Sequence, residues 1–148
     1  MSTVTIRAFS AADFDAWYPL WRGYQAFYKV DIPRETSEVT WKRILDPAEP
    51  MHGVFALDGG RPVGIVHYIE HRSCWTVGNY CYLQDLFVEP GLRGRGLGRV
   101  LIEHVYEEAR RMGCSRVWWL TQESNAQAML LYDRIADKPG FVQYRKIL

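Results

Sequence analysis

The sequence has no marked excess of either charge: 18 Lys and Arg side chains stand against 17 Asp and Glu side chains, and the formal net charge is +1. Proteins that bind nucleic acid or anionic membranes chiefly through charge carry a broad basic surface, which this balance does not favour. Long apolar runs are lacking as well, since none approaches the roughly 20 residues that span a bilayer. We therefore expect no nucleic-acid partner and no membrane partner.

Secretion signals and paired cysteines are also missing from the pattern. Residues 1–6 lack a basic segment followed by an apolar one, so we expect no signal peptide. Cys74, Cys81 and Cys114 are odd in number and show neither CxxC nor metal-ligand spacing. The plain interpretation is three reduced thiols in a cytoplasmic protein without a metal site. A reactive cysteine is a minor alternative, because none of the three is clearly paired with a histidine.

Aromatic residues are abundant, with six Trp, nine Tyr and six Phe among 148 residues. Hydrophobic residues make up 48% and charged residues 24%, which is typical of one globular domain, here residues 1–148. Phe14, Trp17, Trp21, Tyr24 and Tyr28 recur at helical spacing, and we expect the first three to pack in the core.

Hydrophobic periodicity predicts the order β-α-α-β-β-β-α-β-α-β, an α/β (α+β) fold whose mixed sheet has helices on both faces. Pro19 lies inside the first helix and predicts a possible kink or break there. Strands are expected over residues 3–7, 52–57, 63–69, 80–88, 116–120 and 141–147, and helices after the caps Ser10 and Ser124, over residues 37–45 and over residues 97–112.

A glycine-rich turn between a strand and a helix is the strongest local signal. Its residues are Arg93, Gly94, Arg95, Gly96, Leu97 and Gly98, followed by Arg99. The first N–H groups of a helix bind anions, and residues without a Cβ atom let a diphosphate approach. The turn lacks the Gly-Lys-Ser/Thr of a Walker loop and the spacing and position of a dinucleotide fingerprint. An ordinary glycine-rich turn with surface arginines remains the alternative.

The flanks of this turn resemble the GNAT N-acetyltransferase superfamily. Residues 82–90 (YLQDLFVEP) lead into the turn as in that family, and a second family pattern follows in Asn125, Ala128, Leu131 and Tyr132, with Gly140-Phe141 further on. The connection over residues 133–139 is longer than in typical members. The subgroup of yeast histone/polyamine and D-amino-acid acetyltransferases shares it, and residues 20–28 (LWRGYQAFY) also resemble that subgroup.

The resemblance implies an enzyme that uses acetyl-CoA as acyl donor and a mostly antiparallel sheet whose fourth and fifth strands splay apart. The coenzyme arm is then expected to pair with the backbone of the strand before the turn, and its diphosphate to lie on the turn. The resemblance assigns coenzyme contacts to Leu86, Phe87, Val88, Arg93, Gly94, Arg95, Gly96, Leu97, Gly98, Arg99 and Asn125. Tyr132 matches the family's general acid, which protonates the departing thiolate; a half-buried helix aromatic is the alternative.

The acceptor half of the site is less defined. Gln84-Asp85 stands where spermidine/spermine acetyltransferases have Glu-Asp, and an amide cannot act as a base. Asp85 is a candidate base acting through a water, Glu123 is a second candidate, and a purely structural carboxylate is the alternative for Asp85. The histidines at 67 and 71 are expected to pair locally.

The expected amine site is aromatic and only lightly acidic, with Gln25, Tyr28 and Gln84 as substrate-binding candidates. It favours a primary amine of a small, amino-acid-like or polyamine-like molecule. The alternatives are a non-catalytic acyl-CoA-binding or interaction module, and an acetyltransferase for protein or peptide amines. The resemblance also implies a homodimer, in some members through exchange of C-terminal strands.

Overall fold

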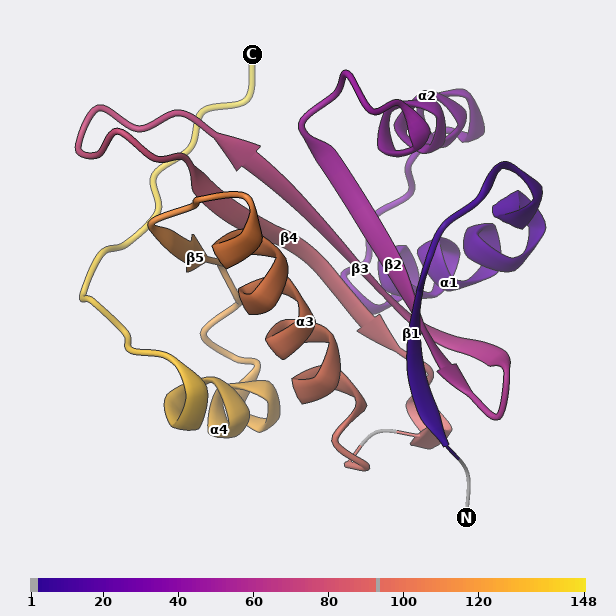
Figure 1. The fold of residues 1–148 in the computed structure, drawn as a ribbon. Coiled ribbons are helices and arrows are strands. Elements are labelled where there is room, and N and C mark those ends of the chain that lie inside the picture. Colours follow the sequence, from indigo (N-terminus) through magenta and orange to yellow (C-terminus); the bar gives the residue numbers. More distant parts are fainter. Residues whose placement is uncertain (1–2, 93) are drawn as a thin grey trace.

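The structure, a computed structural model, describes residues 3–92 and 94–148 as one sheet with helices on both sides (Figure 1). The strands follow the order β1-β2-β3-β4-β5; β1 to β4 are antiparallel neighbours, and β5 runs parallel to β4. The strands are β1 (Val4–Ala8), β2 (Met51–Asp58), β3 (Arg61–His71), β4 (Tyr80–Val88) and β5 (Arg116–Trp118). The helices are η1 (Ala11–Asp13), α1 (Phe14–Phe27), α2 (Arg34–Leu45), η2 (Pro90–Leu92), α3 (Leu97–Arg111) and α4 (Ala126–Ile135).

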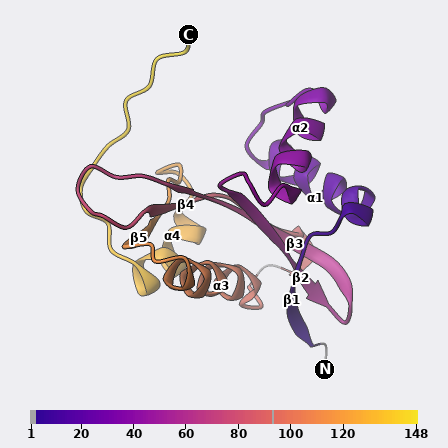
Figure 2. The same cartoon turned by 45° about the horizontal axis from the view of Figure 1, so that its top comes forward.

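Two cores of different composition lie on the two faces of the sheet. The face under α1 and α2 is aromatic, with Trp17, Trp21 and Trp41 buried against Phe55 and Phe87. The opposite face, under α3 and α4, is mainly aliphatic. The residues that α3 contributes to it are Leu97, Leu101, Ile102, Val105 and Ala109. Figure 2 shows the helix pairs on either side of the sheet. The predicted fold class, a mixed sheet with helices on both faces, is confirmed.

Helix α1 runs without a break through Pro19. A proline inside a helix removes one backbone hydrogen bond. Its neighbours Trp17, Leu20 and Trp21 are buried in the aromatic core, and this packing holds the helix together. No helix in the described residues is long and apolar enough to cross a bilayer.

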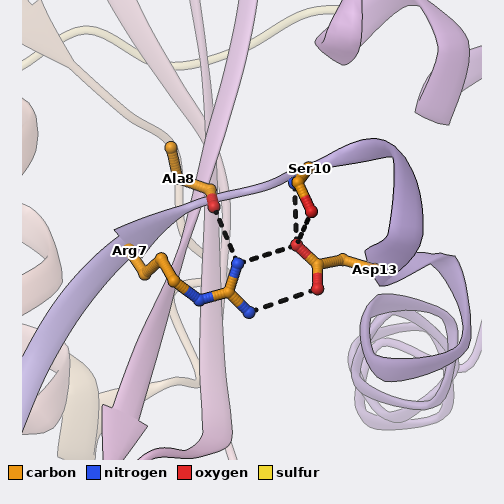
Figure 3. A network of polar contacts seen from close by, with 4 residues as sticks. All are labelled: Arg7, Ala8, Ser10 and Asp13. Atoms are coloured by element: carbon orange, nitrogen blue, oxygen red, sulfur yellow. Dashed lines mark hydrogen bonds and ion pairs between the residues drawn. The ribbon is translucent and has the colours of Figure 1, made fainter.

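A polar network ties the end of β1 to the start of α1 (Figure 3). The Arg7 guanidinium donates to both carboxylate oxygens of Asp13, at 2.8 and 3.2 Å, and to the Ala8 carbonyl at 3.2 Å. The Ser10 backbone N–H and hydroxyl donate to the same carboxylate, at 2.7 and 2.8 Å. These bonds fix where α1, with its row of aromatic side chains, begins over the sheet.

The predicted closing strand over residues 141–147 is wrong for the single chain. Residues 141–148 form no strand, and the side chains of Phe141, Val142, Tyr144 and Ile147 are at least 76% exposed. The neighbouring strand β5 is only three residues long, shorter than the predicted residues 116–120, so it offers little ladder for another strand. Asn125, not Ser124, occupies the N-cap position of α4.

Candidate active site

A β-bulge at Gln84 sets the geometry of β4. His67 of β3 pairs with Asp85, but the next residue, Tyr68, pairs with Leu83, so Gln84 is an extra residue in β4. Side chains alternate along a strand, and Cys81 and Leu83 point into the core under α3. Without the bulge Asp85 would join them; with it, Asp85 points to the α1 face.

The parallel strands β4 and β5, of which β5 is the last strand of the sheet, separate soon after they begin to pair. Strand β5 pairs with β4 only at Tyr80, Cys81 and Tyr82, whereas β3 follows β4 as far as Val88. The chain after β5 turns toward α4, where the Trp119 ring meets the Tyr132 ring edge-on with centroids 5.3 Å apart. The expected splay of the fourth and fifth strands is confirmed.

Asp85 ends a buried hydrogen-bond chain that crosses from α1 to β4. The Trp17 indole N–H donates to His67 Nε2 at 2.9 Å, and His67 Nδ1 lies 2.9 Å from Asp85 Oδ2. An indole nitrogen can only donate, so Nε2 carries no proton and the proton sits on Nδ1, which donates to Asp85. Trp17, His67 and Asp85 are 0%, 4% and 7% exposed. The carboxylate is thereby paired in a place where an unpaired charge would be costly.

Two tyrosines, Tyr24 and Tyr82, lie beside this carboxylate. Burial raises the pKa of Tyr24, and the charge and a hydrogen bond of Asp85 raise it further. Burial, with a smaller contribution from Asp85, also raises the pKa of Tyr82. Both phenols therefore stay protonated at neutral pH and present O–H groups beside Asp85.

Tyr132 lies on α4, on the other face of the sheet from α1. Burial raises its pKa to about 12, with a smaller contribution from Tyr28 at the end of α1. The Tyr132 phenol is thus fully protonated at neutral pH and can give a proton to a stronger base. Tyr24, Tyr28, Asp85 and Tyr132 form one set of interacting groups, contributed by α1, β4 and α4.

The glycine-rich turn has the geometry of an anion site at the start of α3. Gly94 and Gly96 have φ angles of 84° and 80°, which L side chains rarely adopt, and a Cβ atom on either would meet nothing within 4 Å. Gly96 is the N-cap of α3, a helix of 15 residues that the buried Leu97 anchors in the core. The space above this helix end is open to a ligand that bonds with its N–H groups.

The arginines of the turn contact carboxylates of the protein. Arg95 donates to Asp58 at 3.2 Å, and Arg99 donates to Glu103 at 2.7 Å. Arg93 lies outside the described residues. The two described guanidiniums therefore sit beside the helix end but share their charge with neighbours.

The remaining predicted residues divide into those near this site and those with local roles. Leu86 and Val88 pack under α3, and Phe87 packs under α1. Asn125 donates to the Thr121 hydroxyl at 3.2 Å. Gln84 is exposed at the bulge.

Gln25 has a role in the loop after α1. Its side chain is buried, and its Oε1 accepts the Ile32 backbone N–H at 2.8 Å, which holds the segment between α1 and α2. Gln25 Nε2 is buried and has no hydrogen-bond partner among the described residues. The structure thus gives Gln25 a supporting position behind Tyr24 and Tyr28 in the helix.

The role of His67 was missed from the sequence. The expectation that His67 pairs locally is wrong, because its partners are Trp17 of α1 and Asp85 of β4, the candidate base. His67 lies 18 residues before Asp85. Strict alternation of side chains along β4 would place Asp85 on the face opposite His67, because it does not account for the extra residue Gln84. The signal that was available is one polar side chain within an otherwise apolar β3 face that includes Ile65.

Comparison with known proteins decides the family. The model of the "Acetyltransferase (GNAT) family" matches residues 16–136, which include β4, the glycine-rich turn and α4. The chain belongs to the GNAT acetyltransferase family. It is therefore an acyltransferase, an acetyl-CoA-dependent N-acetyltransferase, as the flanks of the turn predicted; a non-catalytic module is not favoured.

Named relatives agree with this assignment. The acetyltransferase is 37% identical over 145 residues to the D-amino-acid N-acetyltransferase of Saccharomyces cerevisiae, covering 97% of this chain and 90% of that protein. It is 35% identical over 100 residues to the thialysine N-epsilon-acetyltransferase of Caenorhabditis elegans, covering 68% and 61% of the two chains. An aminoglycoside N-acetyltransferase solved with CoA superposes with a TM-score of 0.83 at 19% identity, over 99% of this chain and 96% of that one. The last likeness concerns the fold.

Proposed function

We propose that this acetyltransferase transfers the acetyl group of acetyl-CoA to the primary amine of a small, amino-acid-like molecule, bound between the end of α1 and the bulge of β4. The observation that carries the proposal is the position of Asp85. Its buried carboxylate is directed to the α1 face by the bulge and lies beside the protonated phenols of Tyr24 and Tyr82. A cationic amine needs such a carboxylate both as its binding partner and as its base.

Acetyl-CoA is proposed to bind along β4 and on the start of α3. The backbone of Leu86, Phe87 and Val88 is the proposed support for the coenzyme arm, because β5 diverges from β4 before these residues. The diphosphate is proposed to lie on the N–H groups of the turn, where the glycines leave open space. The full proposed contact set on the turn and on α4 is Arg93, Gly94, Arg95, Gly96, Leu97, Gly98, Arg99 and Asn125.

In the proposed mechanism Asp85 accepts a proton and Tyr132 donates one. Asp85 takes one proton from the substrate ammonium, directly or through a water, and passes it to solvent. The freed amine forms the C–N bond to the acetyl carbonyl carbon as the C–S bond breaks. Tyr132 gives its proton to the departing sulfur and regains one from the new amide nitrogen. The pKa of about 12 keeps Tyr132 protonated for this step.

The amine site favours one positive charge rather than several. Asp85 is the buried carboxylate of the site, and its neighbours Tyr24 and Tyr82 are phenols whose raised pKa keeps them neutral. A long polycation would need further carboxylates for its other ammonium groups. Gln84, exposed at the bulge, is proposed to contact the neutral part of the substrate, and the buried Gln25 is proposed to support this site through its bond to the Ile32 N–H. The names of the yeast and nematode relatives, which refer to D-amino acids and thialysine, fit this choice.

A thiol-release assay over a panel of amines tests the proposal. The panel includes D- and L-amino acids, thialysine, spermidine and a short lysine-containing peptide. We expect turnover with amino-acid-type amines and little with spermidine. Tight coenzyme binding without turnover on any of these amines would overturn the proposed substrate class, and preferred turnover of the peptide would assign a protein amine instead.

We also propose that the acetyltransferase is a cytoplasmic homodimer. Cys74, Cys81 and Cys114 are free thiols, which a reducing compartment preserves. The apolar residues of the exposed tail, residues 141–148, suit exchange with a second copy. Light scattering should give a mass twice 17.2 kDa, and a monomer at micromolar concentration would contradict the proposal.

A further inference from the structure

We infer that His67 is a positioning residue for the acetyl transfer, and that Trp17 fixes the ring nitrogen with which His67 holds the Asp85 carboxylate toward the amine. The inference rests on the proposed role of Asp85 as base. Its structural basis is the buried chain Trp17 Nε1–H to His67 Nε2 and His67 Nδ1–H to Asp85 Oδ2, each link 2.9 Å long.

Trp17 fixes the tautomer of His67, so that the ring donates a hydrogen bond to Asp85 from Nδ1. The indole N–H occupies the lone pair of Nε2, so a proton on Nε2 would place two N–H groups against each other in a buried site. The remaining proton must sit on Nδ1, where Asp85 is the acceptor. His67 therefore donates to Asp85 and cannot turn its acceptor nitrogen toward the carboxylate.

The imidazole ring is held on several sides. Its centroid lies 5.1 Å from that of Trp21, 5.9 Å from that of Trp17 and 6.1 Å from that of Phe9. The cross-strand partner of His67 is Gly53, and a Cβ atom there would lie 2.4 Å from the Phe9 ring and 3.1 Å from His67 Cδ2. The absence of a side chain at position 53 thus provides the room in which Phe9 and His67 fit.

The effect on Asp85 follows from its surroundings. The titratable groups that face it are His67 from β3, Tyr24 from α1 and Tyr82 from its own strand. The aromatic ring of Phe87, also buried on this face, offers no hydrogen bond. If His67 is lost, a carboxylate that is 7% exposed keeps only phenol donors and is no longer held toward the amine site.

Three variants separate the parts of this chain. His67→Leu removes both hydrogen bonds, and we expect kcat/KM for the amine to fall about 100-fold. His67→Asn keeps an N–H at the Nδ1 position and should recover most of that loss. Trp17→Phe keeps a ring but removes the donor to Nε2, so His67 can carry its proton on either nitrogen, and we expect a smaller loss of kcat/KM than for His67→Leu.

His52→Leu is the matched control. His52 also contacts a carboxylate, Glu70 at 3.2 Å, but His52 stacks on Tyr68 of the aliphatic core, on the face of the sheet opposite Asp85. We expect its kcat/KM and pH profile to match the wild type. Coenzyme affinity, measured by calorimetry, should be unchanged in all these variants.

Two outcomes distinguish this inference from the proposed function. If Asp85→Asn retains full activity, Asp85 is not the base and the proposed mechanism itself fails. If Asp85→Asn is inactive while His67→Leu keeps the wild-type kcat/KM and pH profile, only the positioning role is overturned. An ¹⁵N NMR spectrum of the wild-type histidine rings adds a readout independent of activity: we expect His67 protonated at Nδ1 and bare at Nε2, and the reverse tautomer would refute the inference even if His67→Leu does not fold.

Discussion

Tyr28 and Tyr132 interact electrostatically although α1 and α4, the helices that bring them, cover opposite faces of the sheet. The proposed acid on α4 and the amine site below α1 therefore meet where β5 has left β4. A donor bound along β4 and an acceptor bound against α1 would approach each other there from two sides.

Tyr132→Phe removes the proposed acid and leaves the ring that packs against Trp119. We expect kcat to fall about 100-fold, because general acid catalysis acts in the transition state. The KM for acetyl-CoA should change little. Steady-state kinetics measure both constants. Tyr106→Phe is the control, since it removes the hydroxyl bonded to the Ile135 carbonyl on the same helix α4; an equal loss of kcat there would assign the effect to helix packing.

The pH profile of the wild type should show no basic limb from Tyr132. Burial raises the pKa of Tyr132 to about 12, above its ordinary value, so the phenol is protonated at every lower pH and is lost as an acid only as the pH rises through about 12. The ratio of wild-type kcat to Tyr132→Phe kcat should then stay constant between pH 7 and pH 10. A ratio that declines over this range would mean that the acid ionises earlier.

Gly96→Ala tests the anion site with a matched glycine elsewhere. The φ angle of 80° at Gly96 makes alanine unfavourable by about 1 kcal/mol, and the new methyl group projects into the space proposed for the diphosphate. Gly59→Ala, in the β2–β3 turn with φ 58° and equally open space, should cost similar stability. We expect calorimetry to show a loss of coenzyme affinity of at least tenfold for Gly96→Ala only. Equal affinities would remove the turn from the site.

Asp13→Asn tests the network between β1 and α1. The hydrogen-bonded Arg7 guanidinium, aided by the Ser10 donors, lowers the pKa of Asp13 to about 2. The stabilisation is therefore present above the unfolded-state pKa of about 4 and is lost as the pH falls through about 2. We expect urea denaturation at pH 7 to show a loss of about 1 kcal/mol in the free energy of unfolding, shrinking on acidification. Asp15→Asn, in the first turn of α1, should show neither effect.

Local patterns in the sequence were enough to predict the helices, the first four strands and the glycine-rich turn. Helical spacing marked α1 and α3, and the hairpin glycines marked the β2–β3 turn. The closing strand failed because residues 141–147 have the composition of a strand but find no neighbour in the single chain. Amino-acid composition indicates that a segment tends to form a strand, whereas strand formation also requires a free sheet edge to pair with.

The candidate site was predictable on the donor side and not on the acceptor side. The turn and Tyr132 belong to contiguous motifs, so their positions follow from local sequence. The bond between His67 and Asp85 joins two strands across a register shift, and no local pattern reveals where an extra residue falls. The sequence directs attention to the amide of Gln84, whereas in the structure Gln84 matters as the extra residue that shifts the register of β4.

The bulge at Gln84 also bears on how such an enzyme changes over time. A substitution changes the chemistry of one side chain. The gain or loss of one residue in β4 instead changes the face of the sheet to which the following side chains point, and Asp85 is the first of them. A single codon inserted or deleted at the bulge can therefore move Asp85 between the α1 face and the α3 face, with the amino acids around it left as they were.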